Sequence, residues 1–303
     1  MRAGATTFQD DGPIAALISD GRRLHLQHGP IDLIIEAEGA RDEVLAAYRQ
    51  ARKRFRTVLV ELVDELAMLR LSVDRDVAPT GDIAKRMKAA ALPFADDFIT
   101  PMAAVAGAVA DEVLASLIVG RRLSRAFVNN GGDIAFHLGA GERYVAALVG
   151  DPVVGRVAGR ATVSAENAIR GIATSGRHGR SHSLGIADAV TVLAGNAADA
   201  DAAATMIANA VDLPTSPKIE RAPARALYPD SDLGDRLVTT GVRDLEKNEI
   251  DAALDAGYRY AMKARDRGLI EAAFLSLATS TRVLGDAMDQ TRIEFETELE
   301  TTG

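Results

Sequence analysis

Alternating apolar and polar positions characterise the start of the chain. Three short segments, 14–19, 22–27 and 31–38, alternate in this way. The first two are separated by Asp20-Gly21, a dipeptide typical of a two-residue hairpin turn. The pattern predicts a meander of three antiparallel strands.

Helical spacing of apolar residues replaces this alternation after Ala40. Between residues 40 and 70 apolar side chains recur every three to four positions, which predicts one long helix or two helices separated near Thr57. Residues 77–97 contain prolines and glycine around a short basic helical piece, 83–92, and are expected to form a connector.

Two alanine-rich segments, 101–120 and 197–211, predict buried helices, because small side chains let neighbouring backbones approach closely. Gly107 lies inside the first segment. A helical glycine costs about 1 kcal/mol relative to alanine, so we expect a packing reason or a ligand-binding reason for it.

Short apolar runs punctuated by glycine and asparagine predict strands through the rest of the chain, with one further helix. Strands in runs followed by pairs of helices favour an α+β fold over a doubly wound parallel sheet. We expect one domain over residues 12–285, either undivided or built of two similar halves, and an acidic, fraying tail over 286–303. The predicted strands are 124–138 (with a turn inside it), 142–150, 168–176, 187–195, 236–245 and a closing strand within 269–285, and the helix is 248–268.

The composition narrows the classes of function. The chain has 303 residues, 48% of them apolar, and a net charge of −8 with no tryptophan, which argues against a nucleic-acid surface of basic stripes and stacking rings. The absence of cysteine excludes disulfides and thiolate metal sites, so any metal needs oxygen or imidazole ligands. We see neither a secretory signal nor an apolar run of about 18 residues, and therefore expect a cytoplasmic protein without a membrane partner.

Two polar, glycine-containing segments are candidate ligand sites. The first is Asn129–Asp133, between two predicted strands, where glycines let the backbone approach a ligand; a plain hairpin turn is the alternative. The second is 171–183, whose hydroxyl, arginine and histidine side chains suit a phosphate or another anion, unless it is a surface loop. Its two histidines have a metal-like spacing, but that spacing needs a helix, which so many glycines disfavour. The candidate ligand-binding residues are Asn130, Gly131, Gly132, Asp133, Thr174, Ser175, Gly176, Arg177, Arg180 and Gly107.

Acidic and hydroxyl side chains open the second alanine-rich helix. Asp201 and Thr205 are four residues apart, so on a helix they share a face and could bind a hard cation such as magnesium. The alternative is N-capping by Asp199 or Asp201, with Thr205 in the core.

In their order and spacing, the segments NNGGDIAF, GIATSG, SHSLGIADAVTVLA and ADAAAT resemble an uncharacterised family related to the ApbE-type flavin transferases, over residues 12–285. Such transferases use magnesium to split FAD and attach FMN through a phosphoester bond to a threonine of a target protein. Their α+β fold is of the T-fold kind. The resemblance therefore implies antiparallel sheets packed against the alanine-rich helices.

Matched residue by residue, the family's Ala-Asp-Ala-x-Ala-Thr-Ala pattern falls on 200–206. The resemblance thus implies that Asp201 and Thr205 are magnesium ligands. The Gly-Gly-Asp turn falls on 131–133 and the Thr-Ser-Gly strand end on 174–176, which implies that both line the nucleotide site.

The chain departs from the family's pattern in two places. Gly107 and Asp111 match the Gly-x-Ala-Lys-Gly-x-x-x-Asp helix, but Ala106 replaces its lysine. The loop His-x-x-Asp-Pro-x-Thr-Gly is shortened, so that only His182 is matched. His182 remains the candidate proton carrier, since histidine titrates near neutral pH, and the two arginines of 171–183 could replace the missing positive charge.

These observations leave three hypotheses. The first is a magnesium-dependent ApbE-like enzyme acting on FAD or a related nucleotide, with a protein acceptor if FMN is transferred. The second is a non-catalytic binding protein for a flavin, pterin or similar planar cofactor, which the resemblance links to one-carbon cofactor metabolism. The third is a structural role in which every glycine motif is a turn. Because T-fold sheets associate edge to edge, the resemblance also implies a homodimer.

Overall fold

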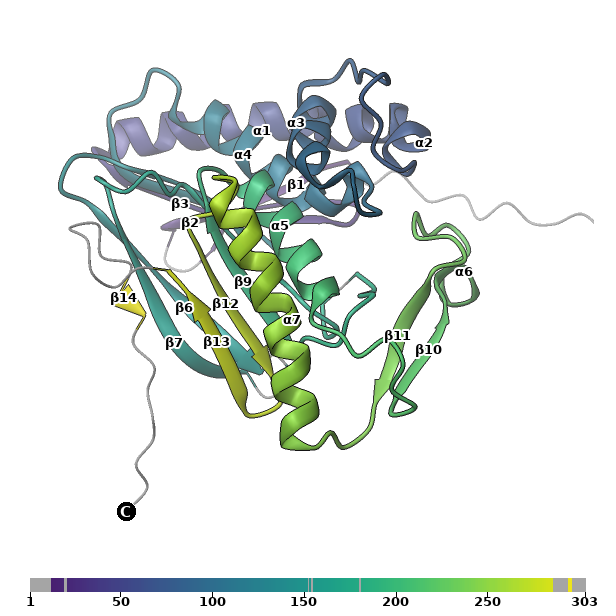
Figure 1. Ribbon diagram of the computed structural model, residues 1–303. Coiled ribbons are helices and arrows are strands. Elements are labelled where there is room, and N and C mark those ends of the chain that lie inside the picture. The colour runs from purple at the N-terminus through teal and green to yellow at the C-terminus, as the bar shows by residue number, and fades with distance from the viewer. Residues whose placement is uncertain are drawn as a thin grey trace, which may run out of the picture.

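The computed structural model describes residues 12–18, 21–151, 153, 155–179, 181–285 and 294–295. A nine-stranded antiparallel sheet runs in the order β1-β2-β3-β4-β5-β8-β9-β12-β13 through the molecule (Figure 1). Helices cover one face, and a three-stranded sheet, β14-β7-β6, packs on the other. The α+β class, with antiparallel sheets against alanine-rich helices, is confirmed.

The N-terminal part contains the predicted meander and helices. Helix α1 continues past Thr57 without a break and ends at Asp64. Of the two alternatives, the long helix is therefore the one observed, and the short helix α2 follows it. The elements are β1 (Ile14–Ile18), β2 (Arg23–His28), β3 (Ile31–Gly39), α1 (Arg41–Asp64), α2 (Leu66–Leu69), α3 (Asp82–Ala91), the 3-10 turns η1 (Leu92–Phe94) and η2 (Pro101–Ala104), and α4 (Val105–Ile118).

The middle of the chain supplies four strands of the large sheet, β4, β5, β8 and β9, and the β6–β7 hairpin that covers its second face. Strand β7 was not predicted, because its small and charged residues give no clear alternation. The elements are β4 (Leu123–Asn130), β5 (Asp133–Leu138), β6 (Arg143–Asp151), β7 (Arg156–Ser164), β8 (Gly171–Ser175), β9 (Ala189–Ala194) and α5 (Ala197–Ala210).

The last third adds a projecting hairpin and closes the sheet. Residues 269–285 form two strands rather than one, since the chain turns at Ala278, whose φ is +53°. Strand β10 was also missed by the sequence pattern. Within 286–303 only β14 is described, paired with β7. The elements are β10 (Ile219–Pro223), α6 (Ala224–Leu227), β11 (Leu237–Val242), α7 (Lys247–Asp266), β12 (Ala272–Leu277), β13 (Ser280–Leu284) and β14 (Glu294–Phe295).

Close approach of α4 and α5 explains their small residues. A Cβ added to Gly107 would lie 2.2 Å from the carbonyl oxygen of Ala197, so the first turns of the two helices touch through their backbones. Most of the buried positions of α5 are alanines. The packing reason expected for this glycine is therefore present.

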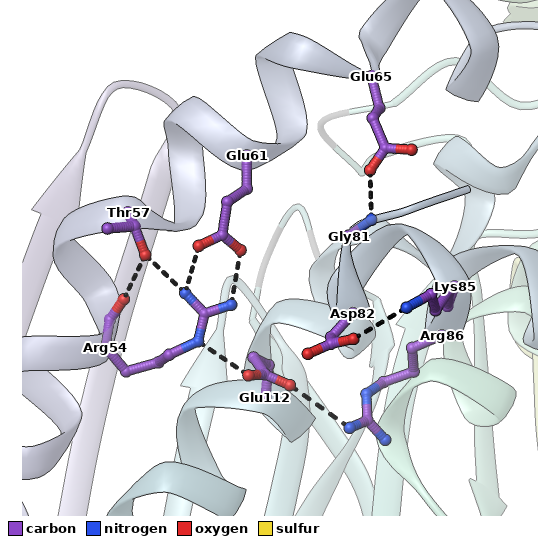
Figure 2. A network of polar contacts seen from close by, with 9 residues as sticks. All are labelled: Arg54, Thr57, Glu61, Glu65, Gly81, Asp82, Lys85, Arg86 and Glu112. Atoms are coloured by element: carbon purple, nitrogen blue, oxygen red, sulfur yellow. Dashed lines mark hydrogen bonds and ion pairs between the residues drawn. The ribbon is translucent and has the colours of Figure 1, made fainter.

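Ion pairs tie the outer helices to α4 (Figure 2). Arg54 on α1 donates to Glu61 and also to Glu112 on α4, with its Nε 2.8 Å from Glu112 Oε1. Arg86 on α3 approaches the second oxygen of Glu112 at 3.5 Å. The network fixes α1, α3 and α4 relative to one another.

One helical stretch within the described residues, Pro101–Ile118, meets the length and composition test for a membrane span, with a mean hydropathy of 1.5. It consists of η2 and α4, and 56% of it is buried inside the fold. This packing is that of a core helix.

A hairpin of β10, α6 and β11, here named the arm (residues 219–242), projects from the body (Figure 1). At its tip the guanidinium of Arg236 lies 3.3 Å from the ring centroid of Phe98. Thr100 also donates its hydroxyl to Asp232. These contacts anchor the tip to the segment that leads into α4.

Candidate functional site

A polar stripe on α5 forms the centre of the site. Asp201, Thr205 and Asn209 are spaced four residues apart and so lie along one side of the helix, among buried alanines. Asn196 caps the helix by accepting the N–H of Asp199. The alternative in which Asp199 or Asp201 caps this helix is therefore wrong, because Asn196 is the N-cap.

Asp201 instead reaches across to α4. Its Oδ2 accepts the N–H of Gly107, in the first turn of α4, at 3.0 Å. In return, Asp111 on α4 accepts the N–H groups of Ala197 and Ala198 at 3.0 and 2.9 Å. Each carboxylate thus satisfies free amides at the start of the other helix, where the helix dipole favours negative charge.

The Gly131-Gly132 pair makes the tight turn between β4 and β5, with φ angles of +66° and +116° that favour glycine. The turn sets Asn130 and Asp133 opposite each other in register. Asn130 donates its amide to the carbonyl of Ala106 on α4, and buried Asp133 accepts the N–H of Thr174 at 3.2 Å. The hairpin interpretation is confirmed, and the hairpin also carries a carboxylate towards α4 and α5.

Three carboxyl groups therefore gather where α4, α5 and the β4–β5 turn meet. Burial raises the pKa of Asp201, and the neighbouring Asp133 raises it further. Burial likewise raises the pKa of Asp133, and raises the pKa of Asp111 to about 6 against the amide hydrogen bonds that oppose the change. For each of the three carboxyl groups, the hydrogen bonds that it accepts do not offset the cost of burying its negative charge.

The donor set suits a hard divalent cation. No Lys or Arg among the described residues forms an ion pair with Asp133 or Asp201, and Thr205 offers a hydroxyl one turn beyond Asp201. Within the same residues no group of three or more His, Asp or Glu side chains is arranged as a metal cluster. A cation would accordingly be held by one or two carboxylates, the hydroxyl and oxygens of the ligand.

The Thr-Ser-Gly strand end lies beside this centre. Thr174 is exposed, and its hydroxyl is 2.8 Å from that of Thr191 on β9. Ser175 is half-buried. A Cβ on Gly176 would lie 2.4 Å from the carbonyl oxygen of Asp188, so glycine is required for packing there.

Arg177 is engaged by a residue that the sequence pattern did not single out. Its Nε and Nη2 donate to Oδ1 of buried Asp188 at 2.9 and 2.7 Å, and His178 Nε2 lies 3.2 Å from the same oxygen. The N–H of Ala278 donates to the other oxygen. Arg180, the second predicted arginine, lies outside the described residues.

His182 belongs to a short loop, residues 181–187, here named the His182 loop. Leu184 in this loop donates its N–H to Asn209 Oδ1 at 2.9 Å, which ties the loop to the end of the α5 stripe. The ring of His182 lies 5.1 Å from that of Tyr228 on the arm, and its Nε2 is buried without a hydrogen-bond partner among the described residues. Asn209 and Tyr228 had no motif that could identify them.

A separate cleft of about 740 Å³ lies at the start of α5, between α3 and the end of α7. Asp199 and Asn196 line it together with Arg86 and Glu112 of the ion-pair network, whereas Asp201, Thr205 and His182 do not. Two residues apart on a helix, Asp199 and Asp201 point in different directions.

Comparison with known proteins identifies the family to which the chain belongs. A family model described as "AbpE bacteria" matches residues 15–289. A UPF0280 protein of Methanopyrus kandleri is 39% identical over 158 residues, which cover 51% of this chain and 58% of that protein. A UPF0280 protein of Methanobrevibacter smithii is 32% identical over 137 residues, covering 45% and 56%. The chain thus spans little more than half the length of these relatives.

A search of solved structures gives the flavin transferase ApbE from Vibrio cholerae, with a TM-score of 0.39 and 12% identity, covering 90% of this chain and 98% of that one. The family match extends over nearly all described residues. The fold and the family model together define an ApbE-like protein. The chain belongs to the AbpE bacteria family.

Proposed function

We propose that this protein is a magnesium-dependent ApbE-like enzyme that binds FAD or a related nucleotide through its diphosphate. The observation that carries the proposal is the environment of Asp201. Its carboxylate is held at the first turn of α4, next to the carboxyl group of Asp133, without a basic partner among the described residues. Thr205 stands one turn away on the same face.

In this proposal Asp201 and Thr205 hold the cation, with Asp133 close by. Bound magnesium would neutralise diphosphate oxygens and stabilise the charge that develops when the bond between the phosphates breaks. Thr174 and Ser175 offer hydroxyls that orient the nucleotide at the end of β8. His182 holds or moves a proton beside the ligand.

FMN transfer to a threonine of an acceptor protein is the finer form of this proposal. The resemblance to flavin transferases supports it, as does the family match. A cytoplasmic location and a homodimer remain predictions.

A second candidate function is ligand binding without turnover. It is favoured because, among the described residues, the lysine and arginine expected to bind the phosphates are replaced or engaged elsewhere. Ala106 stands where the transferase pattern has lysine, and its carbonyl is occupied by Asn130. Arg177, which could have replaced the lysine, is committed to Asp188. A flavin or pterin would then be bound by its ring more than by its phosphates, and a link to one-carbon cofactor metabolism belongs to this candidate.

Calorimetric titration of FAD with and without MgCl₂ tests the proposal. Asp201→Asn is the informative variant, because the amide oxygen can still accept the N–H of Gly107 while the charge is lost. We expect wild-type protein to bind FAD in a magnesium-dependent way and the variant to lose that dependence. Asp82→Asn is the matched control, since Asp82 is an exposed aspartate that lines the other cleft. Equal, magnesium-dependent binding by Asp201→Asn would refute the metal role.

A further inference from the structure

The arm and the His182 loop are connected by hydrogen bonds and together form one continuous surface, here named the wall. Thr239 on β11 donates its N–H to the carbonyl of Ser183 at 2.9 Å. Arg221 on β10 donates to the carbonyl of Leu184 at 2.6 Å and pairs with Asp212, which follows α5. Both Arg221 and Asp212 are largely buried, so the arm holds the loop in place.

This wall begins where the polar stripe of α5 ends. Asn209, which accepts the N–H of Leu184, is eight residues beyond Asp201. At about 1.5 Å per residue, this places the loop attachment roughly 12 Å along the helix from Asp201. An extended nucleotide separates its diphosphate from its ring by a comparable distance.

The wall presents an aromatic side chain that the fold does not use. Tyr228 follows α6 and keeps 65% of its surface exposed, although its ring lies 5.1 Å from that of His182 at an interplanar angle of 51°. Its hydroxyl makes no hydrogen bond within the part of the chain that the structure describes. The exposed part of the Tyr228 ring is available for stacking with a planar ring that lies beside His182.

His182 contributes a second group to the wall that the fold does not use. Its Nε2 is shielded from solvent and lacks a hydrogen-bond partner among the described residues. A buried polar nitrogen of this kind is normally paired, and an imidazole nitrogen can donate or accept according to its tautomer. A heteroaromatic ring has donors and acceptors along its edge, whereas an apolar ring has none.

We propose that Tyr228 and His182 form the ring-recognition subsite of the protein, in which Tyr228 stacks on a planar heteroaromatic ring and His182 binds its polar edge. The inference rests on the proposed function, since that function places the diphosphate of the same ligand at Asp201. His182 is then a specificity residue for the ring. The arm positions Tyr228 through both of its ends, at the His182 loop and at the Phe98 and Thr100 anchors.

Titrations with probes that separate ring from phosphate test the inference. The probes are riboflavin, ADP, FAD and inorganic pyrophosphate, each with MgCl₂, measured by flavin fluorescence or calorimetry. We expect Tyr228→Ala to weaken the binding of FAD and riboflavin roughly tenfold, the usual size of a lost base–aromatic stack, and to leave pyrophosphate binding unchanged. Tyr228→Phe retains the ring and should stay close to wild type. Leu227→Ala, an exposed neighbour on α6, is the matched control.

The outcomes separate this inference from the proposed function. If Tyr228→Ala weakens ADP instead of riboflavin, the subsite takes the purine ring and the inference stands. If Tyr228→Ala binds every ring probe as wild type does, the inference is overturned, while magnesium-dependent pyrophosphate binding would still support the proposed function. Binding of riboflavin that depends on Tyr228, without any binding of pyrophosphate, would overturn the proposed function alone. A wild-type protein that binds no ring probe would contradict the inference outright.

Discussion

Asp111 and Asp201 cap each other's helices: the first accepts two amide hydrogens at the start of α5, and the second accepts one at the start of α4. The arrangement binds two alanine-rich helices that have few large side chains to hold them together. It also fixes the position of the Asp201 carboxylate, which thus has a structural role in addition to the proposed metal-binding role.

Loss of the Asp111 cap should lower stability more than it lowers ligand binding. Removing an N-cap acceptor usually costs about 1–2 kcal/mol, and Asp111 serves two amides. Asp111→Ala is expected to reduce the free energy of unfolding in urea by at least this amount. Asp82→Ala, at an exposed position, should stay within about 0.5 kcal/mol of wild type. Equal stabilities of the two variants would contradict the capping role.

The raised pKa of Asp111, about 6 in the folded protein against an ordinary value near 3.8, predicts a pH dependence of stability. The folded state binds the proton more tightly than the unfolded state, so the favourable contribution is complete below pH 4 and is lost as the pH rises through 6. A tenfold difference in proton affinity between the two states corresponds to about 1.4 kcal/mol. Wild-type protein should lose stability relative to Asp111→Asn between pH 4 and 6 in urea titrations. A constant difference would show that Asp111 does not titrate there.

Binding of magnesium should release protons. Burial raises the pKa of Asp133 and of Asp201, and the neighbouring Asp133 raises that of Asp201 further. A divalent cation favours the ionised form of both carboxyl groups. The apparent affinity for Mg²⁺ should therefore rise with pH across the acidic range. Calorimetry in two buffers that differ in ionisation enthalpy measures the number of protons released. Identical heats in both buffers would argue against the carboxylates as ligands.

Gly107→Ala should separate α4 from α5. The new methyl group would lie 2.2 Å from the carbonyl oxygen of Ala197, and backbone cannot give way as a flexible side chain does. We expect a loss of several kcal/mol in the free energy of unfolding, in the range of overpacked cores or beyond. Gly195→Ala has open space around it and should be nearly neutral. Thermal melts of both variants measure the difference. Similar melting temperatures would disprove the close approach of α4 and α5.

Removal of Asp188 should destabilise the segment after β8. Its buried carboxylate is surrounded by Arg177, His178 and the N–H of Ala278, so Asp188→Ala leaves a guanidinium without its partner. Breaking a buried ion pair from one side typically costs about 3–5 kcal/mol. The double variant Asp188→Ala/Arg177→Ala should recover part of the lost stability in denaturant titrations. No recovery would mean that the pair is not coupled.

The sequence allowed the local architecture to be predicted wherever periodicity or turn chemistry was strong. The meander, the glycine turn before Asp133 and the alanine-rich helices follow from such signals. Strand β7 did not, because its small and charged residues show no clear alternation, although it pairs with its neighbour β6 in a local hairpin. The sequence pattern also missed Asn209, Asp188 and Tyr228. Each is an isolated residue without a local motif, and its partner is known only from the tertiary contacts.

The capping of α4 by Asp201 shows the limit of motif reasoning most clearly. Spacing on α5 placed Asp201 and Thr205 on one face, and the structure agrees. No local pattern could show that the carboxylate reaches Gly107, 94 residues away in the chain. Arg177 had seemed free to bind an anion, and its partner Asp188 became visible only in the fold.

The central claim is that Asp201 and Thr205 bind a divalent cation that contacts a nucleotide diphosphate. Anomalous diffraction from crystals grown with Mn²⁺ and ADP tests it most directly. The account predicts a manganese peak between the Asp201 carboxylate and the Thr205 hydroxyl, with diphosphate oxygens completing the coordination. Bound ADP without a peak there, or a peak confined to another part of the molecule, would contradict it.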